Sequence, residues 1–301
     1  MACLYWGQEL CSAAKANGEK CKNIAYYHID QTLLCGVHSG GKRKEQRVEL
    51  PHHPEEKEIK EAYLTRHKIE YESVALSNRE KNIKGKVTLY KMKMMKNVGF
   101  VHGVVNIFPN FKHGGRVDGI GLPSLSPKSI GPIDHMQPGL PTAQNLENFH
   151  QGNKVFPAEV DEKGQVMDIF FETQRKMYND KFPHRHKEVS GGVNVPLFSL
   201  WKDKESILHR ISYFESRQFY CIYYERATLD NADYIHLKDM MSNGYNLRIC
   251  GYDAYEVTND HSIEDCYCDI SRPFGHELVL YAMLTEPEEK WPWRKYKTFD
   301  F

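Results

Sequence analysis

In some segments of the 301-residue chain the apolar residues recur with the spacing of a helix, and in others with the spacing of a strand. Residues 55–76 carry apolar side chains at helical spacing behind Pro54, with acidic residues in the first turn, which predicts an amphipathic helix. Its predicted apolar stripe is Ile59, Ala62, Tyr63, Ile69 and Val74. The same criterion predicts helices at about 166–178, 217–226, 232–242 and 275–284. Period-2 or continuous apolar stretches predict strands at 86–92, 103–108, 194–201 and 245–252.

Several connecting segments also carry predictions. Residues 109–141 are dense in Gly and Pro but include apolar side chains, so we expect an ordered loop that walls a pocket and brings backbone N–H groups near an anion. Residues 211–215 have strand-like spacing, and Cys266 and Cys268 are interpreted as structural thiols on a strand. His184–Lys187 is a basic tetrad, either a phosphate contact or a solvated loop.

These elements predict an α+β fold, a mixed sheet with surrounding helices, plus a small N-terminal zinc-binding module. We expect the module at residues 1–40, a basic linker and amphipathic helix at 41–85, and the α+β main domain at 86–301.

Composition limits the classes of function. The charges of the 40 basic and 40 acidic residues cancel, so binding to nucleic acid would need a local basic patch. No apolar run is long enough to span a bilayer, and the N-terminus lacks the pattern of a signal peptide. Eight cysteines are too few for a disulfide scaffold in a chain of this length. We therefore expect an intracellular protein, in cytoplasm or nucleus, without a membrane partner.

The strongest local signal is Cys11, Cys21, Cys35 and His38. Three thiolates and an imidazole can close a tetrahedral Zn²⁺ site with no open position, which indicates a structural ion. Buried thiols without metal, or a ligand set that includes Cys3 or His28, are the alternatives. The spacing resembles the small Cys3His zinc knobs of proteins from large DNA viruses. The basic segment Lys42–Arg47 follows, either a phosphate contact for nucleic acid or a solvated linker.

A second polar constellation follows Pro141. On a helix, Glu147, Gln151 and Lys154 share one face, which brings an acid, an amide and an amine together. Phe149 and Val155 lie off that face and are predicted to anchor it in the core. The alternative is a solvated helix face with an internal Glu–Lys pair.

The motif E-x-x-x-Q-x-x-K at residues 147–154 resembles the corresponding helix of the NADAR family. Residues 125–133, 237–249 and 269–284 resemble the loop before that helix, a helix–Gly–strand unit and the late acidic turn with its final helix. The chain departs from the family where the late motif lacks its usual tryptophans. The resemblance extends over about residues 120–285.

NADAR proteins are N-glycosidases that act on ribosyl–nitrogen bonds, so the resemblance implies hydrolysis of an ADP-ribosylated base or a nucleotide-like substrate. Glu147 would stabilise the oxocarbenium charge or activate water, and Gln151 would orient the ribose or the base. Lys154 would act as an amine nucleophile or pair with phosphate. The residues implied in substrate binding are Arg217 and Arg272 for diphosphate, Tyr220 or Tyr224 for stacking, and Asp269 in the acidic turn. The alternative is a non-enzymatic structural or interaction protein, of virion-associated type, stapled by zinc.

Overall fold

The computed structural model describes residues 10–23, 25–29, 31–40, 48–51, 54–93, 98–186, 195–258 and 260–296. The chain divides into two compact units, residues 1–68 and residues 69–301, and the division falls within helix α1, Pro54–Glu80. The predicted phosphate contacts at Lys42–Arg47, and Lys187 of the basic tetrad, lie outside the described residues.

Unit 1 is built on a small antiparallel sheet. Its strands are β1 (Tyr27–Ile29), β2 (Thr32–Leu34) and β3 (Val48–Glu49), in the order β2-β1-β3. Its buried cluster consists of Cys11, Cys21, Ile29, Leu34 and Cys35. Three of these five side chains are cysteines, so the unit has little apolar core of its own.

Unit 2 contains a four-stranded parallel sheet. The strands are β4 (Val87–Lys91), β5 (Val104–Phe108), β6 (Ile120–Gly121) and β10 (Asn246–Gly251), in the order β4-β10-β5-β6. Strand β10 lies between the two earlier strands, with Leu247 paired to both Val87 and Val105. The carboxyl ends of β5 and β10 therefore lie at the same edge of the sheet.

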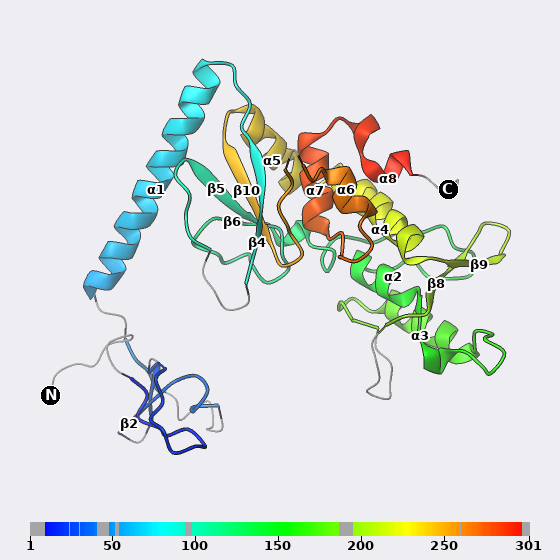
Figure 1. Cartoon of the computed structure of the whole chain (residues 1–301), viewed down its shortest axis with the longest axis horizontal. Coiled ribbons are helices and arrows are strands. Elements are labelled where there is room, and N and C mark those ends of the chain that lie inside the picture. The colour runs from blue at the N-terminus through cyan, green and yellow to red at the C-terminus, as the bar shows by residue number, and fades with distance from the viewer. Residues whose placement is uncertain are drawn as a thin grey trace. The chain divides into compact units, whose positions relative to one another are not determined.

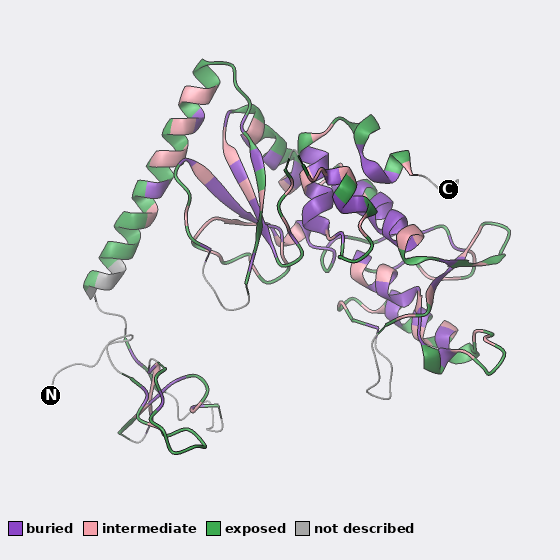
Figure 2. Cartoon of the chain, in the orientation of Figure 1, coloured by how far each residue is buried: buried purple, intermediate pink, exposed green. Residues whose placement is uncertain are grey.

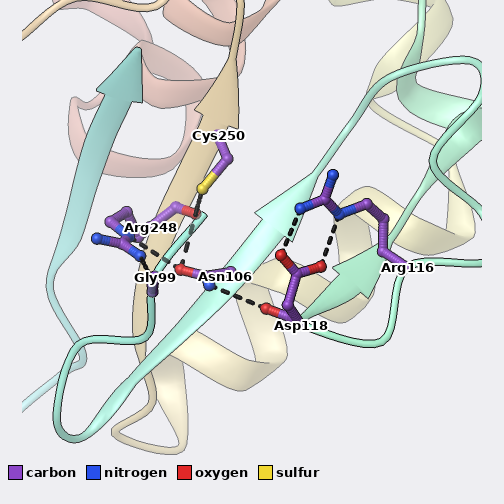
Figure 3. Close-up of polar contacts among 6 residues, drawn as sticks. All are labelled: Gly99, Asn106, Arg116, Asp118, Arg248 and Cys250. Carbon is purple, nitrogen blue, oxygen red and sulfur yellow. Dashed lines mark hydrogen bonds and ion pairs between the residues drawn. The ribbon is translucent and has the colours of Figure 1, made fainter. Parts of the chain in front are cut away.

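Polar contacts across one face of this sheet fix the register of β10 against β5 (Figure 3). The buried amide of Asn106 accepts a hydrogen bond from Arg248 Nε at 2.9 Å and donates one to the carbonyl of Asp118 at 2.9 Å. Arg116 pairs with the Asp118 carboxylate, and its guanidinium lies 4.0 Å above the Phe108 ring. The Asn106 amide therefore links β10 to β5 and β5 to the segment that carries Asp118.

The remaining elements of unit 2 are helical or belong to a second, antiparallel sheet of order β7-β8-β9. The strands are β7 (Lys154–Val155), β8 (Phe198–Lys202) and β9 (Leu208–Ile211). The α-helices are α2 (Leu146–Gly152), α3 (Asp168–Asn179), α4 (Tyr213–Thr228), α5 (Ala232–Ser242), α6 (Ile263–Cys268), α7 (His276–Thr285) and α8 (Pro292–Lys295). The short 3₁₀ helices are η2 (Pro123–Leu125), η3 (Pro157–Glu159) and η4 (Glu288–Lys290).

The core of unit 2 lies between the parallel sheet and the helices that cover it. Helix α7 packs on β4 and β10, α4 packs against α7, and α2 packs against α4 and α3 (Figure 1). Most of the turns of α4 and α7 are buried (Figure 2). The tail returns to this core through Trp291 and Trp293.

Most predicted elements are confirmed, including the helix at 232–242, which is followed by Gly244 at a φ of +87°. Three details differ. Tyr213–Glu215 begin α4 instead of extending a strand, because Ser212 and Glu215 form a capping box there. Cys266 and Cys268 lie on α6, not on a strand. Among the described residues, parallel and antiparallel pairs occupy separate sheets, not one mixed sheet.

The long helix α1 is confirmed, but its apolar stripe is mostly uncovered. Ile59, Tyr63 and Ile69 are 69%, 49% and 60% exposed, whereas Ala75 is buried. Periodicity identifies the side chains that share a helix face, but not whether a neighbouring element covers that face. None of the helices in the described ranges combines the length and the apolar character that crossing a membrane requires.

Candidate functional site

A cavity of about 640 Å³ opens at the carboxyl edge of the parallel sheet. Residues 110–113 follow β5 and residues 252–253 follow β10, and both segments line it together with the start of α7 at residues 275–277. The Asn110 amide donates to the Cys250 carbonyl at 3.1 Å and ties the two loops together. Open parallel sheets bind ligands at this edge, because the loops that follow their strands converge there.

Helix α2 supplies the acid and the amide of the predicted constellation. Asn145 caps the helix by accepting a hydrogen bond from the Asn148 N–H at 2.8 Å. The preceding Gly- and Pro-rich loop accepts hydrogen bonds from the first two N–H groups of the helix. Leu146 N–H donates to the Ile130 carbonyl at 2.9 Å, and Glu147 N–H donates to the Pro127 carbonyl at 2.8 Å. The loop is ordered and packed as expected, and it sets the start of α2.

Glu147, Gln151 and Lys154 all line the cavity. Lys154 Nζ donates to Gln151 Oε1 at 3.2 Å, and Gln151 Nε2 donates to Glu147 Oε1 at 3.2 Å. The three groups therefore form a continuous chain in which the amide bridges the amine and the acid. Lys154 is not on the helix, however, because α2 ends at Gly152 and Lys154 begins β7.

A buried polar network controls this change from helix to strand. Asn153 Nδ2 donates to the Phe149 carbonyl at 2.9 Å, and Asn153 Oδ1 accepts from Tyr178 and from Gln174, both at 2.9 Å. Gln137 donates to the Tyr178 hydroxyl at 3.2 Å. Asn153 is 5% exposed, so these bonds hold the backbone next to Lys154 rigidly. As predicted, Phe149 and Val155 are buried on either side of it.

Burial changes the acid–base behaviour of this group. It lowers the pKa of Lys154 from 10.5 to about 8, with Arg185 acting in the same direction and Glu147 in the opposite one. Burial and the charge of Lys154 also hold the pKa of His150 well below its ordinary value. An amine that is half neutral near pH 8 can act as a nucleophile or a base, which an ordinary lysine does poorly.

The aromatic and arginine side chains on α4 divide by role. Tyr220 lines the cavity, and burial raises its pKa well above the ordinary value, with Tyr224, Glu147 and Glu277 adding to the effect. Tyr224 is fully buried outside the lining, where its hydroxyl donates to the Leu125 carbonyl at 2.8 Å. Tyr220 is therefore available to a ligand, whereas Tyr224 holds the loop.

Arg217 lines the cavity, but its two terminal nitrogens bond the backbone, while its buried Nε has no hydrogen-bond partner among the described residues. Its guanidinium donates to the carbonyls of Tyr267, Asp269 and Arg272, the last at 2.6 Å. It thereby fixes the turn between α6 and α7. The side chains of Asp269 and Arg272 lie outside the lining: Asp269 accepts from Ser271, and Arg272 lies 5.6 Å from the Tyr255 ring.

Several lining residues were not singled out as site residues from the sequence. Lys112 and Lys128 are exposed and cationic, as is Arg185 of the basic tetrad, and all three are in the lining. Glu277 and His276 are buried at the start of α7. The cavity therefore combines exposed cations with one buried carboxylate, that of Glu277. The signal available in the sequence was the end of each predicted strand, since the lining loops follow β5 and β10 directly.

His186, of the basic tetrad at residues 184–187, lies outside the lining and contacts the lining residue Gln151 and also Glu159. Its Nδ1 lies 3.2 Å from the Gln151 carbonyl and its Nε2 lies 2.8 Å from Glu159 Oε1. Through these two contacts the buried ring links the segment that carries Arg185 to the backbone of Gln151 and to Glu159.

The Cys3His group of unit 1 is assembled as the spacing predicted. The ligand atoms of Cys11, Cys21, Cys35 and His38 all lie within 4.8 Å of one another, so they can hold a metal ion. Cys11 Sγ and Cys35 Sγ lie 3.3 and 3.4 Å from His38 Nδ1. Burial raises the pKa of the Cys35 thiol, but N–H groups of His38, Asn23 and Val37 lower it, to about 6 overall. A thiol of this kind is a ready thiolate ligand.

No protein-family description, curated protein or solved structure matches the chain.

Proposed function

We propose that the chain is an N-glycosidase that hydrolyses a ribosyl–nitrogen bond in an ADP-ribosylated base or nucleotide-like substrate, in the manner of the NADAR family. The observation that carries the proposal is the Lys154–Gln151–Glu147 chain, in which an acid and an amine of lowered pKa share one large polar cavity. Such a combination is typical of catalytic sites and unusual on a solvated helix face.

The chemistry follows from the charge that develops during cleavage. Breaking the bond between C1′ and nitrogen leaves oxocarbenium character on the ribose. The Glu147 carboxylate stabilises that charge or takes a proton from the attacking water. The Lys154 amine, half neutral near pH 8, can add to C1′ or pair with phosphate. Gln151 holds both groups in place and orients the ribose.

The exposed cations suggest how the anionic part of the substrate is bound. Lys112, Lys128 and Arg185 line the cavity, and none of them forms an ion pair with a described residue. They are better placed for a diphosphate than Arg217, whose two terminal nitrogens donate to backbone carbonyls, or Arg272, which lies outside the lining. Tyr220 and Phe274 offer aromatic faces to a base.

The test is release of guanine-type base from ADP-ribosylated guanosine by the purified chain, followed by chromatography. We expect Glu147→Gln and Lys154→Ala each to lower the rate by about 10²-fold or more. Glu162→Gln and Lys163→Ala, on an exposed turn away from the cavity, are the matched controls and should leave the rate unchanged. An inactive wild-type chain, or full activity in both cavity variants, would overturn the proposal.

For unit 1 we propose a structural Zn²⁺ ion held by Cys11, Cys21, Cys35 and His38. Ligands at ordinary Zn–S and Zn–N bond lengths lie about 3.5–3.8 Å apart around a tetrahedral ion. The distances of 3.3, 3.4 and 4.0 Å among these atoms are close to that range. Three thiolates and an imidazole suit Zn²⁺ and leave no position for a substrate. Thiolate ligation would suit a reducing, intracellular compartment.

The rival function is a non-enzymatic interaction protein, of viral type, in which the zinc-stapled unit binds a partner such as nucleic acid. The exposed face of α1 and the Cys3His unit favour it, whereas the cavity has no role in it. A salt-dependent gel shift with the full chain, compared with its Cys35→Ser variant, tests nucleic-acid binding through this unit.

A further inference from the structure

Glu277 is a buried carboxylate whose surroundings leave it incompletely paired. The residue is 2% exposed and lines the cavity, and its Oε2 has no hydrogen bond of ordinary geometry among the described residues, with His276 Nδ1 as its polar neighbour at 3.1 Å. A buried charged oxygen without a donor costs free energy, so a fold retains one where a ligand or a reaction uses it.

The fold makes room for this side chain at two glycines. A Cβ atom added to Gly251, at the end of β10, would lie 2.0 Å from Glu277 Oε1 and 2.2 Å from its Cγ. A Cβ atom added to Gly275 would lie 2.7 Å from Oε2. The Glu277 carboxylate therefore lies directly against the backbone, at the sheet edge where the cavity opens. Any larger residue at Gly251 would displace it.

His276 determines the proton content of the pair. Its Nε2 lies 2.8 Å from the Pro109 carbonyl, which can only accept, so Nε2 carries a hydrogen. Its Nδ1 lies 3.1 Å from Glu277 Oε2. Two lone pairs would face each other at this distance unless a proton lies on one of the two atoms. The pair therefore holds one transferable proton beside the cavity.

We propose that Glu277, sharing this proton with His276, is the general acid that protonates the leaving nitrogen. The proposal rests on the N-glycosidase function proposed above and assigns a second carboxylate to it. Glu147 and Glu277 both line the cavity, so the two carboxylates border a common space. Two carboxyl groups with different roles are what hydrolysis of a glycosidic bond requires.

The step balances as follows. The bond between C1′ and nitrogen breaks, its electron pair goes to the nitrogen, and the nitrogen takes the proton from Glu277. Water adds to C1′ and gives its proton to Glu147. The products are a ribose hydroxyl and a neutral base, and the proton gained by Glu147 returns to Glu277 through solvent. No oxidant, reductant or metal takes part.

The experiment compares two substrates that differ in their need for a proton. A guanine-type base linked through nitrogen leaves as an anion unless it is protonated. A nicotinamide-type pyridinium riboside, with the same ADP-ribose part, leaves as a neutral base and needs no acid. In Glu277→Gln we expect kcat/KM to fall by about 10²-fold or more on the guanine-type substrate and by much less on the pyridinium. His276→Asn should give the same split with a smaller loss.

Each outcome is decisive. An equal loss on both substrates in these variants would mean a structural role and would overturn the proposal, as would unchanged activity on the guanine-type substrate. If Glu277→Gln fails to fold, the proposal is tested by the difference between the losses of kcat/KM on the two substrates in His276→Asn. Cleavage of the pyridinium alone by the wild type would also overturn it, whereas a wild type inactive on both overturns the proposed function itself. Glu289→Gln, an exposed acid away from the cavity, is the matched control.

Discussion

At the scale of single residues, the cavity depends on where one amine is held. Lys154 is half-buried, donates to Gln151, and lies near the positive charge of Arg185. Desolvation and the neighbouring cation both disfavour the ammonium form, and together they outweigh the attraction of Glu147. A lysine in such a position differs from the exposed lysines of the same chain in reactivity, not only in location.

This difference predicts selective chemical labelling of Lys154. With a pKa of about 8, about half of its amine is neutral at pH 8, compared with under about 1% for a lysine of ordinary pKa near 10.4. We expect an amine-directed acylating reagent, at limiting amounts, to modify Lys154 before exposed lysines such as Lys163, with a rate that rises through pH 8. Peptide mass spectrometry measures it, and preferential labelling of Lys163 would contradict the prediction.

At the scale of elements, the junction between α2 and β7 determines where the Lys154 side chain lies in the cavity. Helix α2 starts where the preceding loop accepts its first N–H groups, and it stops at Asn153, whose side chain is held by Tyr178 and Gln174 of α3. Lys154 therefore lies on β7 and not on the helix, and its amine is still within hydrogen-bonding distance of Gln151.

We therefore expect Asn153→Ala to destabilise unit 2. The Tyr178 hydroxyl and the Gln174 amide would lose a buried acceptor, which costs about 1–3 kcal/mol in the free energy of unfolding. Urea denaturation followed by circular dichroism measures the change. Asn179→Ala, at the exposed end of α3, is the control and should change stability by less than about 0.5 kcal/mol. Equal midpoints for the two variants would contradict this account.

At the scale of the whole molecule, the two units differ in what stabilises them. Unit 2 has a continuous apolar core between its parallel sheet and its helices. The buried cluster of unit 1 is small and consists mostly of cysteines that face one another. The ion proposed above would supply the folding free energy that so small an apolar cluster does not provide.

Removing the metal should therefore unfold unit 1 and leave unit 2 folded. After treatment of the full chain with a strong chelator, we expect hydrogen exchange to increase in β1 and β2 and to stay unchanged in β10. Native mass spectrometry should find one zinc per untreated chain, none in Cys35→Ser, and one in Cys268→Ser, whose thiol is exposed and outside the cluster. Zinc retained in Cys35→Ser would refute the ligand set.

Local patterns were sufficient for most of the elements and for two clusters. Helical period, caps and turn residues depend on neighbours in the sequence, so α5, α7 and β10 could be predicted from them. The Cys3His group could be predicted because its ligands lie within a short segment. Glu147 and Gln151 could be paired because four residues span one helical turn.

Only the tertiary structure decided which distant side chains share the cavity. Glu277, Lys112 and Arg185 belong to segments far apart in the chain, and all three line one cavity. The insertion of β10 between β4 and β5 brings the loops that follow β5 and β10 to one edge of the sheet. Arg217 and Tyr224 looked like ligand contacts by type, but their partners are backbone carbonyls of other segments. Spacing along the chain specifies neighbours within an element, whereas pairing of strands and burial of helices determine which elements meet.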